Sequence, residues 1–247
     1  VSAQRALSFE RDDTLLNNAG GRINGGSLLL KGASLDNSDG QLISQGRLDA
    51  ILGGALVNTG AARLASGGDL LLRSASVDNR GGKLVSQGLL EISAGSLDNG
   101  AGGVLNSAKG WLKLVTGLFD NSAGVTQAQS LEIRAGQGVR NQQGHLSALG
   151  GDNRIVTADF DNQGGGLYAS GLLSLDGQRF LNQGAAAGQG GKVGAGRIDF
   201  SLAGALANRF GQLESESELH LRAAAIDNSG GSLRALGRSG STRLVAG

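Results

Sequence analysis

One phrase of about twenty residues recurs along the whole chain. Two of its clearest copies are SLDNSDGQLISQGRLDA, residues 34–50, and SVDNRGGKLVSQGLLEI, residues 76–92. An asparagine anchors each copy, at Asn18, Asn37, Asn58, Asn79, Asn99, Asn121, Asn141, Asn162, Asn182, Asn208 and Asn228. All intervals are 19 to 22 residues except the 26 between Asn182 and Asn208. Such regular spacing is the signature of a repeat architecture.

Apolar residues keep fixed distances from these anchors. Two residues before each anchor the chain has Leu16, Leu35, Leu56, Val77, Leu97, Phe119, Val139, Phe160, Phe180, Leu206 or Ile226. Later in the unit come apolar pairs spaced by two, such as Leu70 with Leu72 and Leu112 with Leu114. A spacing of two is the strand period, and Gly, Asn, Asp and Ser between the pairs are turn formers. Each unit therefore contains three short strands, and no segment favours a helix.

Three strands per unit without helices predict an all-β parallel β-helix, a solenoid of about 11–12 coils of roughly 20 residues. We expect residues 1–247 to form a single β-helix segment of a longer chain, because the sequence contains no Met. Coils rising by about 4.8 Å would give a rod of roughly 50 Å. A propeller needs blades of about 40 residues, and a sandwich would not keep one phrase in register.

The anchor asparagines are predicted to be architectural. Asn tolerates left-handed backbone, and stacked Asn amides hydrogen-bond to each other. The expected structural ladder comprises Asn37, Asn58, Asn79, Asn99, Asn121, Asn141, Asn162, Asn182, Asn208 and Asn228.

The phrase Leu-Asp-Asn-x-x-Gly-x-Leu-x-Ser-x-Gly-x-Leu-x-Ile, seen best at residues 77–92, resembles the filamentous haemagglutinin repeat of two-partner-secretion exoproteins. The resemblance implies a right-handed β-helix and export through a dedicated outer-membrane transporter. It also implies secretion or display on the bacterial cell surface, as an adhesin linked to virulence or as the stalk of a contact-dependent growth inhibition toxin. The absence of Cys agrees with that route.

Composition and motifs do not favour catalysis, a metal or a cofactor. The 22 Lys and Arg nearly balance 21 Asp and Glu, so no nucleic-acid partner is expected. The apolar stretches are too short to span a membrane. Asp precedes the anchor at Asp36, Asp78, Asp98, Asp120, Asp161 and Asp227, and we interpret these side chains as solvated. His145 and His220 lie several coils apart, and both are expected to face solvent.

Three residues are candidates for partner contact: Trp111, Tyr168 and Lys192. Exposed aromatic side chains can stack on sugars or anchor a partner. Lys192 falls in residues 183–197, where the long interval predicts a loop inserted between coils. A phosphate-loop interpretation of GAAAGQGGKV fails, because Ala186 and Val193 replace required residues.

The sequence therefore favours a structural stalk or adhesin segment that presents an adhesive or toxic element to a neighbouring cell. The first alternative is a module that binds a glycan or a host or bacterial surface receptor. The second alternative, a polysaccharide-active enzyme, is disfavoured by the short turns.

Overall fold

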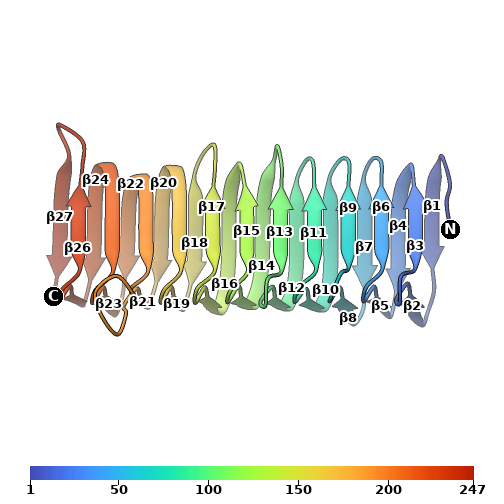
Figure 1. The fold of residues 1–247 in the computed structure, drawn as a ribbon, viewed down its shortest axis with the longest axis horizontal. Helices are drawn as coiled ribbons and strands as arrows, with labels where there is room; N and C mark the ends of the chain where they lie inside the picture. The colour runs from blue at the N-terminus through green and yellow to red at the C-terminus, as the bar shows by residue number, and fades with distance from the viewer.

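The computed structural model describes residues 1–247, and it contains only β-strands joined by turns. The chain winds into a straight parallel β-helix whose termini lie at opposite ends (Figure 1). In Figure 1 the near strands point up, the far strands point down, and the coils advance from right to left, which makes the helix right-handed. The expected fold class is therefore confirmed, and eleven stacked asparagines, from Asn17 to Asn228, mark eleven coils.

Three parallel sheets run along the axis. The front sheet, which faces the viewer in Figure 1, contains β3 (Arg22–Gly25), β6 (Gln41–Ser44), β9 (Arg63–Ser66), β11 (Lys83–Ser86), β13 (Val104–Ser107), β15 (Val125–Ala128), β17 (His145–Ala148), β26 (Ser232–Ala235) and the first halves of β20 (Gly166–Gly177), β22 (Lys192–Leu202) and β24 (Gln212–Ala223). The back sheet contains β1 (Ala6–Glu10), β4 (Ser27–Gly32), β7 (Leu48–Leu52), β18 (Asn153–Thr157), β27 (Ser241–Ala246), the second halves of β20, β22 and β24, and the first parts of β10 (Leu70–Asp78), β12 (Leu90–Asp98), β14 (Trp111–Asp120) and β16 (Ser130–Arg140).

The third, narrow sheet is called the base sheet. It contains β2 (Thr14–Leu16), β5 (Ser34–Asp36), β8 (Ala55–Val57), β19 (Asp159–Asp161), β21 (Arg179–Leu181), β23 (Ala205–Ala207), β25 (Ala225–Asp227) and the last residues of β10, β12, β14 and β16. Each strand pairs in parallel with its equivalent one coil away, for example Val77 with Leu56 and Leu97. Residues of one type therefore stack along the axis.

The core is a set of such inward columns. The predicted apolar pairs are buried: Leu70, Leu90, Leu112 and Leu131 stack in one column and are fully inaccessible to solvent. Two further pairs that the sequence pattern missed, Leu48 with Ala50 and Ile198 with Phe200, fill equivalent positions. Phe160, Phe180 and Phe200 pack with ring centroids 5.5 and 5.1 Å apart. Apart from these phenylalanines and Phe119, the large buried side chains are aliphatic, so stacked aliphatic columns fill most of the core.

A continuous ladder of asparagine side chains runs through the core at the corner between the base and front sheets. Each Nδ2 donates to the Oδ1 of the next ladder asparagine at 2.6–2.8 Å, which gives ten bonds from Asn17 to Asn228. The first member is Asn17, so the expected anchor Asn18 is wrong. Asn17 is buried, whereas Asn18 is exposed and donates to Asp36. Leu15, not Leu16, is the matching inward residue, because it pairs in register with Leu35.

A glycine follows every ladder asparagine except Asn58 at the same corner position, and there is a steric reason for it. A Cβ atom at Gly82 would overlap the carbonyl oxygen of Asn58 in the preceding coil, and one at Gly144 would overlap that of Asn121. Ala62 takes the equivalent position in the coil of Asn58 and is buried there, so this one coil accommodates a methyl group. The corner therefore couples the asparagine and the glycine of the repeat phrase.

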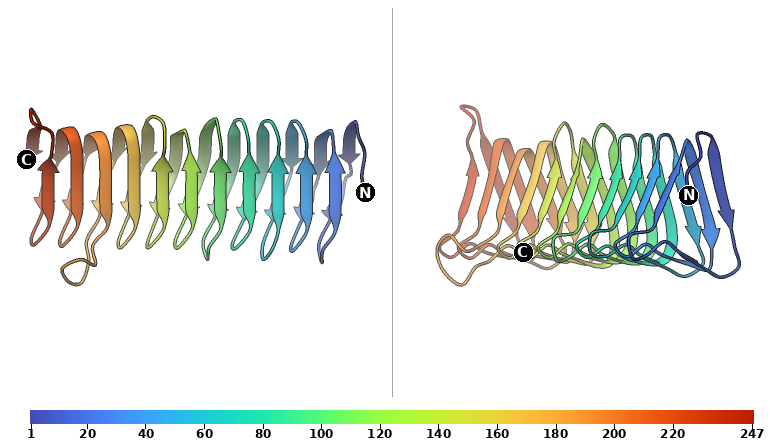
Figure 2. Two further views of the ribbon diagram at one scale, coloured as in Figure 1. Left: turned by 45° about the horizontal axis from the view of Figure 1, so that its top comes forward. Right: turned by 45° about the vertical axis from the view of Figure 1, so that its right-hand side comes forward.

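The long interval between Asn182 and Asn208 forms a loop at this same corner. β21 ends at Leu181 and β22 begins at Lys192, so residues 182–191 connect the strands, and the middle of this loop projects from the rod (Figure 2). Residues 192–197, which the sequence analysis placed in the loop, form the start of β22. The ladder continues past the loop, because Asn182 still donates to Asn208 at 2.7 Å.

We predict that Asn99→Ala lowers the free energy of unfolding by about 1–3 kcal/mol, because it leaves buried ladder groups of Asn79 and Asn121 without their partner. The measurement is urea unfolding followed by circular dichroism. The matched control is Asn106→Ala, since Asn106 points outward from the front sheet. Equal effects of the two substitutions would contradict a stabilising ladder.

We also predict that Asn153→Leu raises the free energy of unfolding by about 1–3 kcal/mol. Asn153 is fully buried between Leu131 and Leu173, and its Oδ1 has no hydrogen-bond partner. Leucine would remove that unsatisfied atom and extend the aliphatic column. The measurement is the thermal midpoint of the variant. A decrease would contradict the prediction, because the lost Nδ2 bond to the Tyr168 carbonyl would then outweigh the gain from removing the unsatisfied Oδ1.

Candidate functional site

Two of the three residues predicted to contact a partner lie together. Tyr168 on β20 and Lys192 on β22 belong to neighbouring front-sheet strands, and both line a hollow of about 640 Å³ beside the 182–191 loop. Its other side chains are Gln143, His145, Gln163, Gln183, Ala185 and Gln189. The sequence analysis considered Tyr168 and Lys192 separately, and only the coil stacking brings them into one site.

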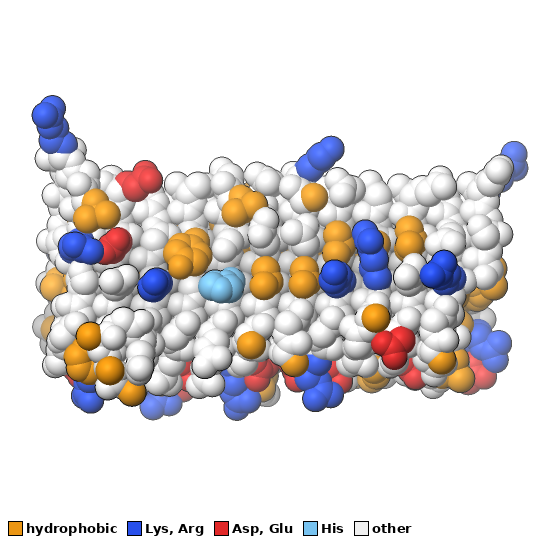
Figure 3. All heavy atoms as spheres, viewed as in Figure 1, with side chains coloured by type: hydrophobic (Ala, Val, Ile, Leu, Met, Phe, Trp, Pro, Cys, Tyr) orange, Lys and Arg blue, Asp and Glu red, His pale blue; other side chains and the backbone are white.

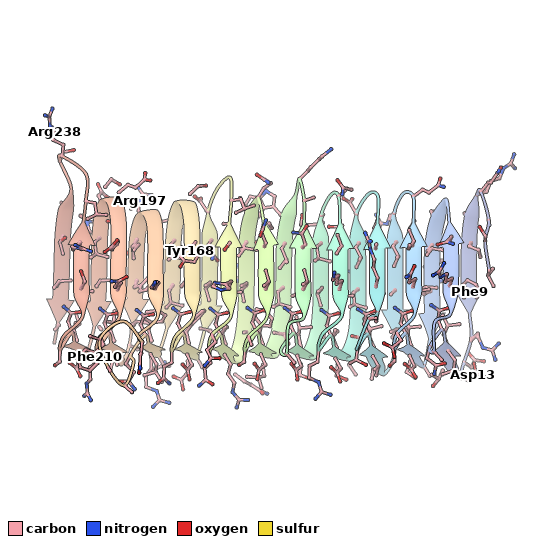
Figure 4. The ribbon with its side chains drawn as sticks, viewed as in Figure 1. Phe9, Asp13, Tyr168, Arg197, Phe210 and Arg238 are labelled. Atoms are coloured by element: carbon pink, nitrogen blue, oxygen red, sulfur yellow. The ribbon has the colours of Figure 1, made fainter.

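The Tyr168 ring fills a space left by two glycines. Gly166 lies in register between His145 and Lys192, and a Cβ there would be 2.6 Å from Tyr168 Cε2 and 2.7 Å from His145 Nδ1. Gly194, the neighbour of Tyr168 in the next coil, lies below the same ring. The ring stands on the front sheet with 37% of the residue exposed (Figure 4). One aromatic surface is therefore held in place and open to solvent.

Glutamine amides supply the polar lining of this hollow. Gln143 and Gln163 come from successive corners of the helix, while Gln183 and Gln189 come from the loop. The side-chain amides of Gln143, Gln183 and Gln189 have no partner within the protein, whereas Gln163 donates to Asp161 at 3.1 Å. Each free amide offers both donors and an acceptor to a polar ligand.

The front sheet carries cations and no carboxylates over nine coils. Its two outward columns run Arg22, Gln41, Arg63, Lys83, Val104, Val125, His145, Gly166, Lys192 and Asn24, Ile43, Ala65, Val85, Asn106, Gln127, Ser147, Tyr168, Gly194. Figure 3 shows this face, with acidic side chains absent from the middle of the sheet. The first outward carboxylate is Glu214, which pairs with Arg234 in the last coils.

The aspartates gather instead on the base sheet, where they hold turns. Asp36, Asp98 and Asp120 each accept the backbone N–H two residues later at 2.8–2.9 Å. The Arg80 guanidinium lowers the pKa of Asp78, which it contacts at 2.6 Å. The Ser229 hydroxyl and N–H, together with Arg209, lower the pKa of Asp227 to about 2. The sequence interpretation of solvated side chains missed this turn-forming role.

Trp111 and His220 lie apart from the hollow, whereas His145 lines it. Trp111 begins the back-sheet part of β14, where Lys113 Nζ lies 5.9 Å from its ring centroid. His145 lies on the front sheet and His220 on the back sheet. No group of three His, Cys, Asp or Glu residues is arranged to hold a metal ion. No helix of the structure is long and apolar enough to cross a membrane.

Comparison with known families agrees with the fold. The haemagglutinin repeat profile matches residues 10–51, 50–114, 101–164, 148–210 and 193–246. The chain belongs to the haemagglutinin repeat family. No curated protein and no solved structure matched the chain. Successive matches overlap, and together they cover residues 10–246, which include the whole asparagine ladder. The family resemblance is therefore confirmed.

We predict that Gly166→Ala displaces the Tyr168 ring without unfolding the helix, because the new methyl group would overlap the ring edge. Tyr168 is the only tyrosine, so its ring resonances in an NMR spectrum report the change directly. Gly136→Ala is the control, since nothing lies within 4 Å of its Cβ position. Unchanged Tyr168 shifts in Gly166→Ala would contradict this placement of the ring.

We predict that Asp227→Asn weakens the acid sensitivity of the fold. A carboxyl whose pKa falls from 3.8 to about 2 on folding stabilises the native state above pH 3.8. That contribution is lost as the pH falls through about 2. Thermal midpoints measured between these pH values should change less in the variant than in the parent. Asp176→Asn, at an exposed position without a hydrogen bond, is the control and should behave as the parent.

Proposed function

We propose that this chain is the stalk of a secreted, cell-surface bacterial exoprotein and that it presents an adhesive or toxic element to a neighbouring cell. Proteins with haemagglutinin repeats are typically secreted or surface-associated, and membership of that family supports the proposal. The observation that carries it is the uninterrupted ladder of ten asparagine bonds, which joins all coils into one rod. A rod of roughly 50 Å holds an element joined to one end that far from whatever is joined to the other end.

The proposed role is mechanical. Hydrogen bonds between coils run along the rod axis, and three strands per coil carry an axial load together. The asparagine ladder adds a fourth line of bonds parallel to them. A pull or push along the axis is thus shared by many bonds in each coil, and stiffness does not depend on any one contact.

The proposed export partner is an outer-membrane two-partner-secretion transporter. Each coil pairs only with its immediate neighbours, so the chain can fold coil by coil as it emerges from a pore. The absence of Cys means that no disulfide can hold the chain folded before export. A surface receptor or glycan on the target cell would be the second partner.

We infer a structural rather than catalytic role. The base-sheet carboxylates, which are the main candidates for acid–base work, are engaged in turns and ion pairs. Their pKa values, where shifted, lie below the ordinary range, which is unsuitable for a general acid near neutral pH. Absence of turnover on neutral and acidic polysaccharides is the expected result.

A coil deletion tests the stalk proposal. Removing residues 59–99 joins Asn58 to Gly100 and deletes two whole coils in register. We expect small-angle scattering to show a rod shortened by about 10 Å. Fused to a two-partner-secretion signal domain, both forms should reach the cell surface when the matching transporter is present.

The control deletion removes residues 59–89, which breaks the register of the coils, and it should fail to form a protease-resistant rod. Retention of the parent chain inside the cell despite a functional transporter would overturn the export proposal. An unchanged maximum dimension after the in-register deletion would overturn the rod mechanism.

A further inference from the structure

The cations of the front sheet differ from those of the base sheet. On the base sheet Arg80, Arg140, Arg179 and Arg209 each lie within 3.6 Å of an aspartate carboxylate. On the front sheet Arg22, Arg63, Lys83 and Lys192 are exposed, and none forms an ion pair. The front-sheet strands thus carry no carboxylate over nine successive coils, and Glu214 in the next coil is paired with Arg234.

The spacing of these cations follows the axis. Arg63 and Lys83 are register partners, so they lie one coil apart, about 4.8 Å along the axis. Like charges this close repel each other, and no acid of the sheet relieves the repulsion. Lys192 lies in the same column five coils further on, about 24 Å away. An elongated anionic partner is complementary to this column.

The hollow beside the 182–191 loop indicates the chemistry of that partner. An exposed ring held over Gly166 and Gly194 offers an apolar surface to the face of a sugar. The unpartnered amides of Gln143, Gln183 and Gln189 can donate to and accept from hydroxyl groups. Lys192, on the edge of the hollow, can pair with a carboxylate of the same sugar.

We propose that the front sheet binds a linear, carboxylate-bearing polysaccharide that lies along the rod axis. One sugar stacks on Tyr168 and pairs with Lys192, and the chain extends over Val125 and Val104 to the cations Lys83 and Arg63. A nucleic acid fits less well, because the front-sheet strands have a single outward aromatic residue and only four cations without an ion pair. This binding role is separate from the stalk function, since rod length and export do not depend on it.

The test measures binding of the whole chain to immobilised polygalacturonate, with neutral dextran and double-stranded DNA as comparison surfaces. We expect binding to polygalacturonate that weakens with added salt and no binding to dextran. Tyr168→Ala and Lys192→Gln should each weaken binding about tenfold, and the double variant Arg63→Gln with Lys83→Gln should weaken it at least as much.

Two controls alter the same residue types on the back sheet. Arg154→Gln removes an outward cation and Trp111→Ala an exposed aromatic, and both should bind as the parent does. Circular dichroism of each variant confirms that the rod is intact. No binding to polygalacturonate, equal binding to dextran, tighter binding to DNA, or equal losses in the controls would each overturn the proposal, while leaving the stalk function untouched.

Discussion

The hydrogen bond from one ladder asparagine to the next is the interaction on which the rest of the structure depends. It fixes the axial rise and the angular position of each coil at one corner, and buried amides without partners would be costly there. The adjacent glycine lets the coils approach closely enough for the bond to form. With the corner fixed, the inward residues of all three sheets fall into columns, and each strand meets its equivalent in register.

Because the ladder sets the register, outward residues also form columns, and each face acquires its own electrostatic character. The base sheet uses its aspartates to close turns and to pair with arginines. The back sheet alternates sign from coil to coil, as in Glu91, Lys113, Glu132 and Arg154. Only the front sheet has nine successive coils with cations and no acids, and the projecting 182–191 loop lies at its edge. A uniform scaffold can in this way present one distinct binding face.

The period of the chain and the alternation of apolar residues were enough to predict the fold, because stacking repeats one local solution many times. The ambiguity at Asn17 and Asn18 could not be resolved from sequence, since both fit the phrase and only burial separates them. The sequence GKVGAG resembles a loop, yet pairing with residues 166–169 makes it a strand. The hollow at Tyr168 was not predictable from sequence. Its residues come from two turns, the 182–191 loop and three strands, and only the coil register brings them together.

Hydrogen exchange of the asparagine side-chain amides, measured by NMR on the labelled chain, tests the central claim most directly. The account predicts slow exchange for the ten donors from Asn17 to Asn208, each of which is bonded to the next ladder asparagine. Outward amides such as Asn18 and Asn106 should exchange rapidly in the same sample. Rapid exchange of the ladder amides in a chain that still shows a β-sheet spectrum would contradict the account, because coils would then stack without the asparagine bonds.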